Sequence, residues 1–171
     1  GLMFGTDKNS GWHGYFDYYE QLFGDRHRIV TLLEMGTLDN RSLQTWDAWF
    51  THPETCIFGL ELEDHYPNPN LPRVIRHIGS QDDPVALQKL IKAADKPFDI
   101  IIDDAGHFTP QIIVAFEFLF PHVRPGGIYI IEDLCAPGYD DVYIGHGWTG
   151  TMAVRREGKS IMDYLYSIVD T

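Results

Sequence analysis

Cysteine is scarce in this chain, whose 171 residues include two, Cys56 and Cys135. They lie far apart in the sequence, and neither belongs to a CxxC pattern, so we expect a reduced, cytoplasmic compartment. No apolar run approaches the roughly 20 residues that a membrane-spanning helix requires. No signal peptide is recognisable at the N-terminus. The sequence therefore predicts neither a disulfide framework nor a membrane partner.

Basic residues are also few. The chain has 13 Lys and Arg against 25 Asp and Glu, a formal net charge of −12. Binding to nucleic-acid phosphates needs a basic face, so this balance argues against a nucleic-acid partner. Hydrophobic residues make up 44% of the chain, which excludes a disordered protein. The length is sufficient for one domain with a hydrophobic core.

Short apolar runs alternate with segments of helical periodicity along the chain. Strands are expected at 31–35, 56–62, 73–78, 100–103 and 127–131, and helices at 41–50, from Pro84 to Ala94, from Pro110 to Phe120 and at 160–169. Apolar strands that alternate with helices are typical of a parallel sheet covered on both faces. The pattern predicts an α/β fold with a doubly wound, Rossmann-like, mostly parallel sheet.

Acidic residues follow the fourth and fifth expected strands. The run from Phe98 ends in Asp103 and Asp104 with His107 three residues later, and the run Ile128–Ile131 ends in Glu132 and Asp133. The carboxyl ends of parallel strands share one edge, where ligands bind. Oxygen donors from Asp104, Glu132 and Asp133 suit Mg²⁺ or another hard cation. His107 is near enough to Asp104 to act as a general base. The alternative is that these acids cap the helices that follow.

The turn after the first strand bears on the choice of cofactor. It contains one glycine, Gly36, and places Asp39 where a pyrophosphate would be repelled, which disfavours NAD and FAD. S-adenosylmethionine, which has a sulfonium and no phosphate, fits better. Glu61 at the tip of the second strand is placed to accept hydrogen bonds from the ribose hydroxyls. Glu34 is expected to be buried, so its carboxylate needs partners, either the loop amides or the amino group of the cofactor.

The domain prediction is a single S-adenosylmethionine-dependent unit over residues 1–171. Within it we expect an N-terminal cap or substrate segment (1–28), a cofactor-binding core (29–133), a lid loop (134–150) and a C-terminal helical segment (151–171). The loop is rich in Gly, Tyr and Asp and directly follows the fifth strand. Long loops above a binding edge often serve as lids.

Several of these stretches together resemble the metal-dependent macrolide-sugar O-methyltransferases, which methylate deoxysugar hydroxyls in antibiotics such as mycinamicin and tylosin. The matching stretches are Gly5–Lys8, His13–Tyr15, Leu32–Gly36, Ser42–Leu43, Gly59–Leu62, Phe98–His107 and Phe120–Leu134. Ile-Asp-Asp-x-x-His followed by Pro-Gly-Gly-x-Tyr-x-Ile-Glu-Asp is a specific combination. The resemblance implies a class I methyltransferase fold and Mg²⁺-dependent methyl transfer from S-adenosylmethionine to a hydroxyl of a glycosylated natural product, in bacterial-type secondary metabolism.

The resemblance also assigns residues. It implies metal ligands at Asp104, Glu132 and Asp133 and a catalytic histidine at His107. Its cofactor contacts fall on Glu34, Gly36, Ser42, Glu61, Ser80, Gln81 and Asp104. Asp103 is expected to brace the strand end or to contact the amino group of the cofactor.

Two departures from the family pattern leave alternatives open. Asn40 and Arg41 replace glycines that usually precede the helix-opening serine; Asn tolerates a left-handed backbone, whereas Arg41 is expected to crowd the methionine end of the cofactor. We expect the C-terminal antiparallel hairpin of the fold to be missing, which would leave the fifth strand as an exposed edge and make a homo-oligomer plausible. One alternative is a cephalosporin-hydroxylase-like enzyme that modifies small molecules. Another is a non-catalytic, methyltransferase-like binding subunit.

Overall fold

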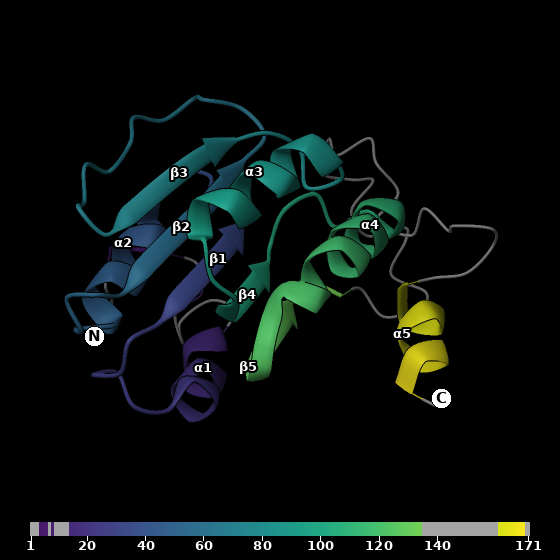
Figure 1. The fold of residues 1–171 in the computed structure, drawn as a ribbon, viewed down its shortest axis with the longest axis horizontal. Coiled ribbons are helices and arrows are strands. Elements are labelled where there is room, and N and C mark those ends of the chain that lie inside the picture. The colour runs from purple at the N-terminus through teal and green to yellow at the C-terminus, as the bar shows by residue number, and fades with distance from the viewer. Residues whose placement is uncertain (1–3, 7, 9–13, 135–160, 170–171) are drawn as a thin grey trace.

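The computed structural model describes residues 4–6, 8, 14–134 and 161–169 (Figure 1). In this part of the chain, five strands form one parallel sheet in the order β3-β2-β1-β4-β5. The strands are β1 (Thr31–Met35), β2 (Cys56–Glu61), β3 (Val74–Ile78), β4 (Phe98–Asp103) and β5 (Val123–Ile131). This arrangement confirms the α/β, Rossmann-like, parallel fold predicted from the alternating pattern.

Helices cover both faces of the sheet (Figure 1). They are α1 (Tyr15–Phe23), α2 (Arg41–Trp49), α3 (Pro84–Ala94), α4 (Thr109–Leu119) and α5 (Ile161–Val169), with a short 3₁₀ helix η1 (Phe120–His122) before β5. One core layer packs α1 and α2 against the sheet, and a second packs α3 and α4 against the opposite face. None of the helices in the described residues is long and apolar enough to cross a membrane.

Burial on both faces explains why the central strands read as continuous apolar runs. All five residues of β1 are buried. Leu32 packs into the α1–α2 layer and its neighbour Leu33 into the α3–α4 layer, because successive side chains point to opposite faces. Ile100 and Ile101 on β4 divide between the layers in the same way. Neither strand has a solvent-facing side that would interrupt the apolar run.

The order of the strands creates a switch point between β1 and β4. These strands are neighbours in the sheet, yet the chain leaves β1 toward β2 and leaves β4 toward β5. Gly36, with a φ of 82°, lies so close to the end of β4 that an added Cβ would be 2.0 Å from the carbonyl oxygen of Asp104. Ligands of doubly wound sheets bind at such a point.

Several features differ from the sequence-based expectations or extend them. Helix α1 was not expected. Strand β5 begins at Val123 rather than Gly127, and it continues through a register shift against β4 and a left-handed Gly126. It forms one edge of the sheet in the described residues. Nearly all of the expected lid loop, and Ser160 of the last expected helix, lie outside the described residues.

Candidate functional site

A cavity of about 700 Å³ opens at the carboxyl ends of the strands. Its walls come from the loops after β1, β2, β3 and β4, from the N-terminal segment and from Asp133 after β5. Of the predicted site residues, eight line it: Gly36, Ser42, Glu61, Ser80, Gln81, Asp104, His107 and Asp133. The side chains of Glu34, Asp103 and Glu132 are buried beside it and do not line it.

The loop after β1 is held by Glu61. One carboxylate oxygen of Glu61 accepts hydrogen bonds from the backbone N–H groups of Thr37 and Leu38, at 2.8 and 2.6 Å. The other oxygen accepts from Leu62 N at 2.8 Å. Glu61 therefore shapes the loop while it faces the cavity. Its contact with the ribose of a cofactor stays a prediction.

Asp104, His107 and Asp133 converge on one wall of the cavity. His107 Nε2 is 3.9 Å from Asp104 Oδ1 and 3.8 Å from Asp133 Oδ2. One potential ligand atom from each of the three lies within 4.8 Å of the others. His107 and Asp133 both have a positive φ, of 54° and 53°. A non-glycine residue with this backbone is uncommon and is often found at a functional site.

Glu132 points away from this wall and into the protein. Both of its carboxylate oxygens accept hydrogen bonds from Lys8 Nζ at 2.9 Å, and one also accepts a short bond from the Tyr19 hydroxyl. Lys8 also donates to Asp104 Oδ2. Burial raises the pKa of Glu132 and of Asp104, and Lys8 partly offsets the rise. Asp104 Oδ1 and Asp133 Oδ2 thus face His107, whereas both oxygens of Glu132 are engaged by Lys8.

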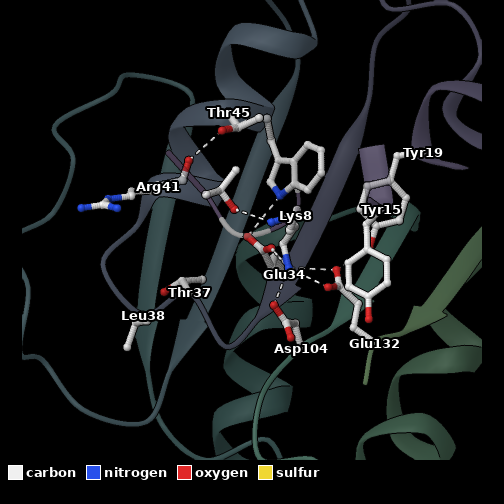
Figure 2. Close-up of polar contacts among 12 residues, drawn as sticks. Lys8, Tyr15, Tyr19, Glu34, Thr37, Leu38, Arg41, Thr45, Asp104 and Glu132 are labelled. Carbon is white, nitrogen blue, oxygen red and sulfur yellow. Dashed lines mark hydrogen bonds and ion pairs between the residues drawn. The ribbon is translucent and has the colours of Figure 1, made fainter. Parts of the chain in front are cut away.

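Glu34 has partners other than the loop amides considered from the sequence. Its side chain is fully buried, Oε2 accepts from Trp46 Nε1 at 3.1 Å, and Oε1 is 3.6 Å from Lys8 Nζ (Figure 2). Burial raises the pKa of Glu34 to about 7, although Lys8 acts in the opposite direction. The loop amides bond to Glu61 instead. The other partner suggested for Glu34 was the amino group of the cofactor, and that contact stays a prediction.

Asp103 braces the loop after β4 at the base of the cavity. Gln81 Nε2 donates to Asp103 Oδ1 at 3.0 Å, and Gln81 Oε1 accepts from the backbone N–H of Gly106. Burial raises the pKa of Asp103 to about 7. The two roles expected of Asp103, at the strand end or toward the amino group of the cofactor, stay predictions.

The first departure from the family pattern, Asn40 and Arg41 in place of glycines, is accommodated by the turn at the start of α2. Asn40 adopts the left-handed conformation, with a φ of 66°, and its side chain donates to Pro67 O at 3.1 Å. The guanidinium of Arg41 pairs with Asp39 at 2.9 Å and donates to Gly5 O at 3.2 Å. Figure 2 shows Arg41 directed away from Glu34. Arg41 still lines the cavity, so its effect on a cofactor stays a prediction.

Three side chains of the N-terminal segment reach the acidic residues and were not assigned a role from the sequence. Lys8 contacts Asp104 and Glu132, Tyr19 contacts Glu132, and the Tyr15 hydroxyl donates to Asp133 Oδ1 at 2.7 Å. These partners are about a hundred residues apart in the chain, so no local spacing predicts the contacts. The available signal was the family-like stretches Gly5–Lys8 and His13–Tyr15.

Comparison with known proteins gives the site a context. The chain is 35% identical over 178 residues to an 8-demethyl-8-(2-methoxy-α-L-rhamnosyl)-tetracenomycin-C 3′-O-methyltransferase from Streptomyces olivaceus, an alignment that covers 96% of this chain and 42% of the relative. It is 36% identical over 137 residues to the demethylmacrocin O-methyltransferase of Streptomyces fradiae, with 75% and 34% coverage. No family model matches.

Comparison with solved structures points to the same group of proteins. A crystal structure of the MycE methyltransferase of the mycinamycin biosynthetic pathway, in complex with Mg, SAH and mycinamycin VI, superposes with a TM-score of 0.78 at 30% identity. The match covers 98% of this chain and 43% of that one. The chain thus spans less than half the length of the relatives it matches. By sequence and by structure, it is a homologue of the macrolide-sugar O-methyltransferases and has their class I methyltransferase fold.

Proposed function

We propose that this chain contributes the catalytic domain of an S-adenosylmethionine-dependent O-methyltransferase that acts on a sugar hydroxyl of a macrolide-like glycosylated natural product. The observation that carries the proposal is the meeting of Asp104, His107 and Asp133 on the wall of a cavity that also contains the Gly36 loop and Glu61. The relatives named above support the substrate class. The expectations of a cytoplasmic location, a small-molecule partner and self-association through the β5 edge remain part of this proposal.

The cavity fits both groups that this reaction needs. A Cβ at Gly36 would overlap the Asp104 backbone, so only glycine gives a ligand this close an approach to the switch point. Asp104 and Asp133 offer oxygen ligands, which Mg²⁺ prefers, and Glu132 would complete the predicted set. When bound, S-adenosylmethionine supplies an electrophilic methyl group and Mg²⁺ lowers the pKa of an acceptor hydroxyl.

The side chains of the chain then have distinct roles. Asp104 and Asp133 would hold the cation, and Glu61, which accepts hydrogen bonds from the amides of Thr37 and Leu38, would also accept them from the ribose. His107 Nε2, which faces both aspartates, takes the proton of the acceptor hydroxyl. Ser42, Ser80 and Gln81 line the part of the cavity predicted to hold the cofactor. Positioning of the hydroxyl against the methyl group supplies much of the acceleration.

The His107→Ala variant tests the assignment of the base. We expect turnover with a glycosylated macrolide acceptor to fall by about 10²–10⁴-fold, while calorimetry still detects binding of S-adenosylhomocysteine. His65→Ala is the matched control, because His65 is exposed on the loop after β2 and should leave turnover unchanged. Near-normal turnover in His107→Ala would exclude His107 as the base.

A further inference from the structure

Lys8 is a buried cation within the acidic cluster. Its side chain is 2% exposed, and Nζ donates to Asp104 Oδ2 and to both oxygens of Glu132 at 2.9 Å. Glu34 Oε1 lies 3.6 Å from the same nitrogen. Figure 2 shows the lysine reaching between these three carboxylates, which come from the ends of β1, β4 and β5.

The charges around Lys8 are unbalanced. Lys8 Nζ lies within hydrogen-bond or ion-pair distance of the carboxyl groups of Glu34, Glu132 and Asp104. One lysine therefore faces three acidic side chains, and Asp133 adds a fourth on the neighbouring wall of the cavity. A buried charge is stable only when it is paired, and removal of one partner leaves the other uncompensated. The cluster needs a cation, and Lys8 provides one from within the chain.

The ammonium also engages oxygens that the predicted metal set requires. The two oxygens of Asp104 have different surroundings, because Oδ2 accepts from Lys8 whereas Oδ1 faces His107 and the cavity. Both oxygens of Glu132 contact Lys8, and Oε1 also accepts from the Tyr19 hydroxyl. A divalent cation can reach Asp104 Oδ1 and Asp133 from the cavity. A divalent cation that also binds Glu132 has to replace the contacts that Lys8 makes with it.

We infer that Lys8 is the resident cation of the Asp104–Glu132 pair, and that a divalent cation binds there by displacing its ammonium. The inference rests on the metal site of the proposed function. It adds that the Lys8 ammonium competes with the metal for the same carboxylate oxygens. It makes Lys8 a positioning residue, which keeps the acids compensated before the metal arrives. Replacing the ammonium with a neutral side chain of similar length should then favour the metal.

Calorimetric titration of MgCl₂ into Lys8→Met at fixed ionic strength tests this inference. We expect Mg²⁺ to bind at least tenfold more tightly than to the unsubstituted protein. We also expect Tm to be lower than that of the unsubstituted protein without Mg²⁺, and to rise more when Mg²⁺ is added. Lys92→Met, at an exposed position in the last turn of α3, is the control and should change neither value. Equal or weaker Mg²⁺ binding by Lys8→Met would overturn the inference and leave the proposed metal site intact.

A second measurement does not depend on how well the variant folds. Lys8 of the unsubstituted protein should be protected from an amine-reactive label without Mg²⁺ and become labelled at saturating Mg²⁺, as read by peptide mass spectrometry. Lys8 that stays protected while calorimetry shows bound Mg²⁺ would overturn the inference alone. Absence of Mg²⁺ binding in both the unsubstituted protein and Lys8→Met would instead overturn the metal site itself.

Discussion

Gly36→Ala should be among the most damaging single-methyl changes in the sheet. The added Cβ would lie 2.0 Å from Asp104 O, 2.5 Å from Asp104 C and 2.6 Å from Ala105 Cα, and all three are backbone atoms directly after β4, which no side-chain rotation can move away. Forcing an L-residue into the left-handed region costs about 1–2 kcal/mol. Overpacking of a rigid site adds about 1–3 kcal/mol. The expected loss in the free energy of unfolding is therefore about 2–5 kcal/mol.

Gly14→Ala separates these two contributions. Gly14 is also in the left-handed region, with φ 72° and ψ 13°, but a Cβ there would meet no atom within 4 Å. Its loss should be limited to the backbone cost of about 1–2 kcal/mol. Urea denaturation of both variants measures the difference, which we expect to be about 1–3 kcal/mol. If Gly36→Ala is no less stable than Gly14→Ala, the close approach of the β1 and β4 ends is wrong.

Two further predictions concern carboxylates of the site. The folded-state pKa of Glu34 is raised from 4.5 to about 7, so the folded state binds a proton more readily than the unfolded state, and this contribution to stability is lost as pH rises through that window. Glu34→Gln should remove this pH-dependent contribution. If the urea midpoint falls by the same amount between pH 5 and pH 7.5 in the variant and in the unsubstituted protein, the assignment to Glu34 is refuted. Glu61→Gln should weaken binding of S-adenosylhomocysteine about tenfold, because hydrogen bonds to a charged group contribute about 1.5–3 kcal/mol. Glu63→Gln, at an exposed position two residues away, is the calorimetric control and should bind normally; equal affinity of the two variants would count against Glu61.

Burial explains which parts of the fold the sequence predicted. The first strand was predicted at its observed bounds, because all of its residues are buried and form an unbroken apolar run. Helix α3 was marked by Pro84 in its first turn, and the Asp83 side chain does accept a hydrogen bond from Val85 N. Strand β5 was predicted four residues short, because Pro125 and Gly126 indicate a turn whereas the chain passes through them as an irregular part of the strand.

Helix α1 was missed because it carries little local signal. It follows a left-handed Gly14, no side chain caps it, and its exposed face includes Tyr18 and Leu22 beside the buried Tyr19 and Phe23. Tertiary packing stabilises the helix, because Tyr19 and Phe23 pack around Trp46 of α2.

The site shows the same division between local and long-range information. Acids at the ends of neighbouring parallel strands were predicted to meet, and Asp104 and Asp133 do so together with His107. Lys8 was not predicted to join them, because its contacts cross 96 and 124 residues of sequence. Ion pairs of this kind depend on how the N-terminal segment packs onto the sheet, and the hydrophobic periodicity of the sequence does not predict that packing.

The central claim is that the cavity supports metal-dependent methyl transfer to a sugar hydroxyl. The most direct test follows the labelled methyl group of S-adenosylmethionine onto a panel of macrolide and other glycosides, first in EDTA and then after addition of excess MgCl₂. We expect transfer to a sugar hydroxyl only when Mg²⁺ is present. Transfer that persists unchanged in EDTA, or no transfer to any glycoside with Mg²⁺ and cofactor both present, would contradict the account.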